Sequence, residues 1–269
     1  MIDPSGEIRD LLPLRIYLVR VQYWSEMEAV METRTAEEFT PTHHAQLMAW
    51  IAKAVVAAAG EEEGERIIRK AVVKYGNQRG RRMALRAEAD GRPRTITNYM
   101  AYAEVNTRGA AKSKIVAKSP DARTYMLRCD WHDAWEENDL MRFGRYFCME
   151  IDQAVVQGFN EELVLEVNGT MSNGAEYCDF VFRDANFTLP KMAGLVWKMA
   201  VSPGRRVVMP WEYHVGHLYK TLGEVIAEEL GERAVDVMAA GLKDFRDRYG
   251  DSAAETVLAY QGVDFDQLP

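Results

Sequence analysis

Hydrophobic and polar positions divide the chain into helical ends and a central part with strand-like alternation. A helical period is predicted over residues 7–35, with a break near Pro13, and again over residues 41–60. Residues 61–91 form a third predicted helix, because acidic residues fill its first turn and arginines follow later, as the helix dipole prefers. The pattern is helical once more from Trp211 onward. We therefore expect helical layers at both ends of the chain.

The central part of the chain predicts a sheet interrupted by one helix. Residues 94–106 are rich in β-branched and aromatic side chains, which favours a strand. Residues 112–129 predict two strands around a Ser-Pro-Asp turn, and residues 162–184 predict a hairpin with an Asn-Gly pair near its tip. Between these strands a helix is expected over about residues 133–157, begun by a capping box in its acidic form.

These elements predict an α+β fold, with a mainly antiparallel sheet, an inserted helix, and N- and C-terminal helices packed against them. We expect residues 1–40 to form an N-terminal helical extension and residues 41–269 to form a single α+β domain. The segment 187–210 is apolar but is interrupted by prolines, and its pattern supports no assignment to an element.

Charge and composition argue against nucleic acid and membranes as binding partners. The formal net charge of −8 argues against a general nucleic-acid-binding protein, which usually presents a basic surface. No apolar run reaches the roughly 20 residues of a membrane-spanning helix, and the first residues lack a secretory signal pattern. We therefore expect a cytoplasmic protein with neither nucleic acid nor membrane as a partner, and a homo-oligomer stays open. The three cysteines are expected to be free thiols or ligands rather than a disulfide framework.

The helix predicted over residues 133–157 carries candidate chemistry at the edge of its apolar face. Helical spacing places Arg145, Cys148 and Asp152 on one stripe beside the core side. A neighbouring arginine lowers the pKa of a thiol, so Cys148 is a candidate nucleophile, with Asp152 as a general base. The alternative is an unreactive, buried Cys148 beside a partly buried ion pair between Arg145 and Asp152.

The other two cysteines extend this candidate site. Cys129 ends a predicted strand, and His132 follows it at a strand-to-helix junction, where functional groups are often displayed. Alternation along the hairpin places Cys178 on its core face. A zinc site formed by Cys129, Cys148, Cys178 and His132 is one interpretation, since zinc favours sulfur and nitrogen ligands. Because the spacing lacks a close C-x-x-C pair, we expect no bound metal and no cofactor.

Two further groups are candidates outside these segments. Arg79, Arg81 and Arg82 suit the capture of an anion, because guanidinium groups pair well with carboxylates. The alternative is a solvated basic face near a helix end. His214 and His217 are three residues apart on a predicted helix, which is a weak metal signal. His214 is a candidate for proton transfer, because imidazole titrates near neutrality, although an ordinary interior histidine is the alternative.

One long stretch resembles a known family. The sequence "YFCMEIDQAVVQGFNEELVLEVNGTMSNGAEYCDFVFRD" combines a cysteine, an aspartate four residues later, a Phe-Asn pair, a glycine-containing turn and a Cys-x-Phe-x-Phe strand. In this chain these residues are Cys148, Asp152, Phe159, Asn160, Gly174, Cys178, Phe180 and Phe182. Together with "GERIIRKAVVKYGNQRGRR" and "WEYHVGHLY", the pattern is similar to that of the L-2-amino-thiazoline-4-carboxylic acid hydrolase family over roughly residues 60–250.

The resemblance implies a hydrolase that opens a small nitrogen-containing ring, such as a cyclic amide, amidine or thiazoline, in a substrate that carries a carboxylate. We expect Cys148, Asp152 and His214 to be catalytic. The residues expected to bind the substrate are Arg145, Cys129, His132, Cys178 and Arg79. The segment around Cys178 is also similar to the hairpin of vinyl-reductase-like small-molecule-binding domains, so a non-catalytic sensor is the alternative function.

Overall fold

The computed structural model describes residues 38–105, 111–200 and 207–269 of the chain. Phe39–Pro269 forms one compact unit. The helix predicted over residues 7–35 lies outside the described residues.

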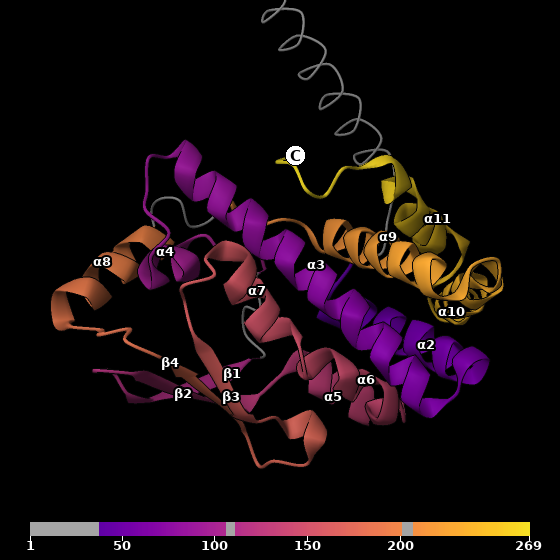
Figure 1. Ribbon diagram of the computed structural model, residues 1–269, viewed down its shortest axis with the longest axis horizontal. Coiled ribbons are helices and arrows are strands. Elements are labelled where there is room, and N and C mark those ends of the chain that lie inside the picture. Colours follow the sequence, from indigo (N-terminus) through magenta and orange to yellow (C-terminus); the bar gives the residue numbers. More distant parts are fainter. Residues whose placement is uncertain (1–37, 106–110, 201–206) are drawn as a thin grey trace, which may run out of the picture. The chain divides into compact units, whose positions relative to one another are not determined.

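Long helices build the main core and confirm the helical predictions for residues 41–60, for residues 61–91 and from Trp211 onward. They are α2 (Pro41–Ala59), α3 (Glu61–Ala89), α9 (Trp211–Leu230), α10 (Arg233–Tyr249) and α11 (Asp251–Ala259). In Figure 1, α2 lies against α3, α9 and α10. Residues 43–49 of this helix are buried on all sides, which makes it the centre of the layer. Among the helices of the described segments, none has the length and apolar character needed to cross a membrane.

A four-stranded antiparallel sheet confirms the predicted α+β class and both predicted strand pairs. Its strands are β1 (Lys112–Ala117), β2 (Ala122–Arg128), β3 (Leu165–Gly169) and β4 (Cys178–Phe182), in the order β1-β2-β4-β3. A short 3₁₀ turn, Met171–Asn173, and the left-handed Gly174 connect β3 to β4, as the predicted hairpin requires. Met126 pairs with Cys178, and residues paired across strands share a face of the sheet.

The single helix predicted over residues 133–157 is wrong, because this segment forms three short helices. They are α5 (Asp130–Glu136), α6 (Met141–Cys148) and α7 (Ile151–Phe159). Asp139 in the left-handed region and Glu150 with φ −127° mark the two breaks. The first break lets the fully buried Trp135 lie directly on Gly144, where a Cβ atom would come within 2.1 Å of the indole. Burial of this large side chain outweighs the helical propensity of the intervening residues.

The strand predicted over residues 94–106 is also wrong, because its described part forms the short helix α4 (Ile96–Ala101). Thr95 caps this helix by accepting a hydrogen bond from the backbone N–H of Asn98 at 3.4 Å. Capping and the burial of Asn98 therefore override the β-propensity of the neighbouring residues. Helix α8 (Leu189–Ala200) occupies the segment for which the sequence supported no assignment, and it packs on α4.

Two glycines let α7 cross α3 with the two backbones almost in contact. A Cβ atom at Gly80 would lie 2.1 Å from a backbone oxygen of α7, and one at Gly158 would lie 2.3 Å from a backbone oxygen of α3. Any larger residue would force the helices apart. The crossing brings Arg79 of α3 and Asp152 of α7 to the wall of one cavity.

Candidate active site

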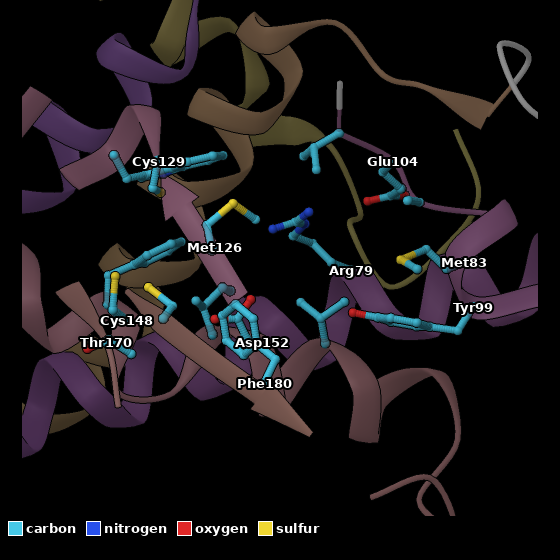
Figure 2. Close-up of a pocket in the computed structure, with 17 residues that line it drawn as sticks. Arg79, Met83, Tyr99, Glu104, Met126, Cys129, Cys148, Asp152, Thr170 and Phe180 are labelled. Atoms are coloured by element: carbon cyan, nitrogen blue, oxygen red, sulfur yellow. The ribbon is translucent and has the colours of Figure 1, made fainter. Parts of the chain in front are cut away.

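A cavity of about 250 Å³ lies between the sheet and helices α3, α4, α6 and α7 (Figure 2). Most of its wall is apolar, with contributions from Met83, Met126, Trp131, Phe147, Ile151, Val155 and Phe180. The polar side chains on the wall are Arg79, Tyr99, Glu104, Cys129, Cys148, Asp152, Thr170 and Cys178. Ligand pockets usually span roughly 300–1,000 Å³, so this cavity suits a small molecule.

Arg79 supplies a buried positive charge to the cavity. The residue is 7% exposed, and its Nε has no hydrogen-bond partner. Its guanidinium group lies over the ring of Tyr75, 5.6 Å from the ring centroid. Within the described ranges, no carboxylate approaches Arg79 to the 4.0 Å of an ion pair. A buried cation without a counter-ion is unfavourable, so an anionic ligand group would be a natural partner.

Hydrogen bonds between uncharged side chains connect Trp131, His44 and Tyr75, and the Tyr75 ring lies against the Arg79 guanidinium group. The indole N–H of Trp131 donates to Nδ1 of His44 at 3.0 Å, which leaves the proton of the imidazole on Nε2. That Nε2–H donates to the hydroxyl of Tyr75 at 2.9 Å. Burial, and then the charge of Arg79, lower the pKa of His44 well below its ordinary value. His44 therefore stays neutral and fixes the position of Tyr75 under the guanidinium group.

Asp152 faces the same cavity from the first turn of α7. Burial raises its pKa from 3.8 to about 6, and the positive charge of Arg79 opposes this rise. Asp152 is therefore mostly ionised at neutral pH, yet it is basic enough to accept a proton from a reacting group. Figure 2 shows the Asp152 carboxyl and the Arg79 guanidinium group projecting into the central part of the cavity.

All three cysteines lie on the cavity wall, as the sequence analysis anticipated, and all are free thiols. Burial raises the pKa of Cys148 well above its ordinary value, although a hydrogen bond with Ser172 opposes this effect. Burial also raises the pKa of Cys129 to about 11 and increases that of Cys178. The thiols are therefore protonated at rest, and a nucleophilic Cys148 would need a base to take its proton.

Arg145 does not lie beside the thiol, so its predicted effect on Cys148 is wrong. Its guanidinium group lies over the Tyr146 ring, 5.2 Å from the centroid, and 3.9 Å from the carboxylate of Glu65. Arg145 and Cys148 both lie in α6, but their side chains take different partners, and the break between α6 and α7 removes Asp152 from the predicted stripe. The pKa of Cys148 accordingly rises rather than falls.

Two predicted histidines also lie away from the cavity wall. His132 on α5 has its Nδ1 3.6 Å from the carboxylate of Asp133. His214 on α9 is fully buried, and its Nε2 lies 3.2 Å from the carbonyl oxygen of Glu104. Burial, followed by the charge of Arg79, lowers the pKa of His214 to about 3, so it stays neutral. No group of three or more His, Cys, Asp or Glu side chains in the described segments has the arrangement of a metal site.

Thr170 of the cavity wall was absent from the sequence-based candidates, and so were Tyr99 and Glu104. Tyr99 and Glu104 fall in the segment predicted as a strand, where the capping pattern of Thr95 and Asn98 was the available signal for a helix. Glu104 is fully buried and binds Arg82 and Arg86. Although burial opposes ionisation, these two arginines hold the pKa of Glu104 at about 2. No local sequence pattern could have shown this network, since its members are far apart along the chain.

The fold and the cavity together define an α+β protein with a partly enclosed, mostly apolar cavity that holds Asp152 and the buried Arg79. A model of the L-2-amino-thiazoline-4-carboxylic acid hydrolase family matches residues 42–182, which is more than half of the chain. The chain therefore belongs to this family, which confirms the resemblance and supports hydrolase activity in general. The comparisons with curated proteins and with solved structures give no significant match.

Proposed function

We propose that the protein is a hydrolase that opens a small, nitrogen-containing ring in a carboxylate-bearing substrate by adding water across a C–N bond. The observation that carries the proposal is the buried Arg79, whose Nε has no hydrogen-bond partner and which has no carboxylate within ion-pair distance among the described residues. It shares a cavity with Asp152, whose pKa of about 6 suits a general base. Family membership supports the same kind of reaction. The apolar wall would hold the ring, and Arg79 would hold the carboxylate.

The carboxylate of the substrate, bound to Arg79, would contribute most to orienting the substrate in the cavity. A charge-assisted hydrogen bond contributes roughly 1.5–3 kcal/mol, and a guanidinium group can form two in parallel with one carboxylate. Tyr75 and His44 keep the guanidinium group in place, so little reorganisation is needed when the ligand binds. A ring attached to that carboxylate would extend toward Asp152 and Cys148.

Asp152 would act as the general base of the first step. It would take a proton from the attacking group, which is either the Cys148 thiol or a water molecule, while that group forms a bond to the ring carbon. When the C–N bond breaks, protonated Asp152 would return the proton to the departing nitrogen. In the thiol route, a water molecule would then hydrolyse the enzyme-bound intermediate. Cys129 and Cys178 would contact the ring from the wall.

The proposal places no step on Arg145, His132 or His214, because these residues do not line the cavity. It also needs no metal or cofactor. Elemental analysis of chelator-treated protein tests this point. If about one zinc per chain is found and is lost together with turnover, the attacking group would be water activated by the metal rather than by Asp152.

The experiment that tests the function is a substrate panel of cyclic amides, hydantoins, oxindole-like lactams and thiazolines, each with and without a carboxylate. We expect turnover of at least one carboxylate-bearing member, detected as a mass gain of one water. Cys148→Ala and Cys148→Ser separate the two attacking groups. Near wild-type turnover by Cys148→Ala would exclude thiol attack and leave water activated by Asp152.

A non-catalytic sensor is the second candidate function, and the raised pKa of all three thiols favours it. Protonated thiols are poor nucleophiles and behave as small apolar groups. Tight binding of panel members by calorimetry, with no turnover of any of them, would support the sensor and contradict the hydrolase.

A further inference from the structure

Tyr99 presents a phenolic hydroxyl to the cavity, from α4. Its ring packs edge-on against Phe159, with centroids 5.7 Å apart, and is tilted against the ring of Phe182, with centroids 6.3 Å apart. These contacts fix the plane and the direction of the side chain. Figure 2 shows Tyr99 extending hydroxyl first toward the side of the cavity where Asp152 lies.

No hydrogen bond of the Tyr99 hydroxyl occurs among the described residues, whereas two other tyrosines, Tyr102 and Tyr146, each have one. Tyr102, at the end of the same helix, donates to Asp90 at 2.7 Å, and Tyr146 donates to Glu61 at 2.6 Å. Burial, and then the negative charge of Asp152, raise the pKa of Tyr99 above its ordinary value. The hydroxyl therefore keeps its proton and is available as a donor at all working pH values.

We propose that Tyr99 is a further catalytic residue, which donates a hydrogen bond to the substrate atom that gains negative charge when the ring carbon is attacked. This inference rests on the proposed ring-opening function. Asp152 and Tyr99 face the cavity from different helices, α7 and α4, so a substrate bound between them meets a proton acceptor on one side and a donor on the other. Such a pair suits addition to a polarised C=O or C=N bond.

The step balances without any further reactant. The attacking group forms a bond to the ring carbon and gives its proton to Asp152, while the π electrons of the C=O or C=N bond move onto the heteroatom. Tyr99 stabilises that heteroatom through its O–H group and keeps its own proton. When the electrons return, the C–N bond of the ring breaks, and Asp152 protonates the departing nitrogen.

The test is Tyr99→Phe, which keeps the ring and its packing on Phe159 and Phe182 and removes only the hydroxyl. Removal of one such donor typically lowers kcat by about 10²–10³-fold. We expect a loss of this size in kcat, with KM changed by less than about threefold, for a substrate identified in the panel. Tyr102→Phe is the matched control, because its hydroxyl binds Asp90 and does not line the cavity. We expect its kcat to stay near wild type.

Each outcome decides the inference. A Tyr99→Phe protein with wild-type kcat would overturn the role of Tyr99 and leave the hydrolase intact. A rise in KM with unchanged kcat would likewise overturn it, since it would show ground-state binding alone. If the wild-type protein turns over no member of the panel, the hydrolase proposal and this inference fall together. Far-ultraviolet circular dichroism and the unfolding midpoint confirm that both variants are folded.

Discussion

Arg79 and Arg82 lie one turn apart on α3, and both are buried, yet their surroundings differ completely. The Arg82 guanidinium group donates to both carboxylate oxygens of Glu104, at 3.1 and 2.9 Å, and to the carbonyl oxygen of Phe265 at 2.6 Å. Arg79 has no carboxylate partner in the described part of the chain and faces the cavity. A buried charge that is fully paired contributes to the folded structure, whereas a buried charge left unpaired is available to a ligand.

The sum of the charges supports this distinction. Arg79, Arg82 and Arg86 carry three positive charges around the inner side of the cavity, and Glu104 and ionised Asp152 carry two negative ones. The neighbouring histidines do not add to the positive charge, since burial lowers the pKa values of His44, His214 and His217. The sum for these five side chains is therefore one net positive charge, which favours an anionic ligand.

Asp152→Asn is expected to produce the largest effect, because it removes the proposed base from the cavity while leaving the Arg82 network intact. General base catalysis contributes roughly 10²–10⁴-fold, so kcat should fall by about that factor. Steady-state kinetics on the panel substrate is the measurement. In the wild type, the rate should rise with pH through about 6 as Asp152 ionises. A variant that keeps both its rate and this pH dependence would contradict the assignment.

The same substitution should stabilise the protein at neutral pH. The pKa of Asp152 is about 6 in the folded state, against an ordinary value of 3.8, so the folded state binds the proton more tightly. The stability from this group is therefore present at low pH and is lost as the pH rises from about 4 to 6. Each pKa unit corresponds to about 1.4 kcal/mol, which gives Asp152→Asn a gain of up to about 3 kcal/mol at pH 7. Urea unfolding measures it.

Glu104→Gln, in contrast to Asp152→Asn, should strongly destabilise the folded protein. It removes the carboxylate that compensates Arg82 and Arg86, and breaking a buried pair in this way typically costs about 3–5 kcal/mol. Glu88→Gln is the matched control, because Glu88 pairs with Arg94 at the surface, where an ion pair contributes about 1 kcal/mol or less. Equal unfolding midpoints for the two variants in urea would show that the Glu104 network is not structural.

Arg79→Met compared with Arg82→Met gives the most direct test of the difference between the two arginines. We expect Arg79→Met to fold with wild-type stability or better, and to lose about 10–100-fold in kcat/KM for the carboxylate-bearing substrate, as loss of a charge-assisted hydrogen bond requires. The loss should disappear for the matching carboxamide. Arg82→Met should instead be destabilised, because Glu104 loses one of its two arginines and the Phe265 carbonyl loses its donor. Similar unfolding free energies for Arg79→Met and Arg82→Met would contradict the assignment of a structural role to Arg82 and a ligand-binding role to Arg79.

The sequence by itself determined the elements whose pattern is local. Helix-favouring residues that end at Gly60 defined residues 41–60, and acidic residues followed by arginines defined residues 61–91, because such signals need only neighbours along the chain. Turn residues likewise defined the strand pair and the hairpin. The family pattern pointed to Cys148, Asp152 and Cys178, and arginine chemistry pointed to Arg79, and all four line the cavity.

Only the tertiary structure decided which charges are paired and which groups titrate. The burial of Trp135 against Gly144 goes with the broken inserted helix, and the second break, between α6 and α7, removed Asp152 from the helical stripe of Arg145 and Cys148. Arg79 and Arg82 have the same chemistry and adjacent places on one helix, so no local pattern could separate their roles. Their difference depends on where Glu104 falls in space, and burial and charge are sums over residues that only the folded chain brings together.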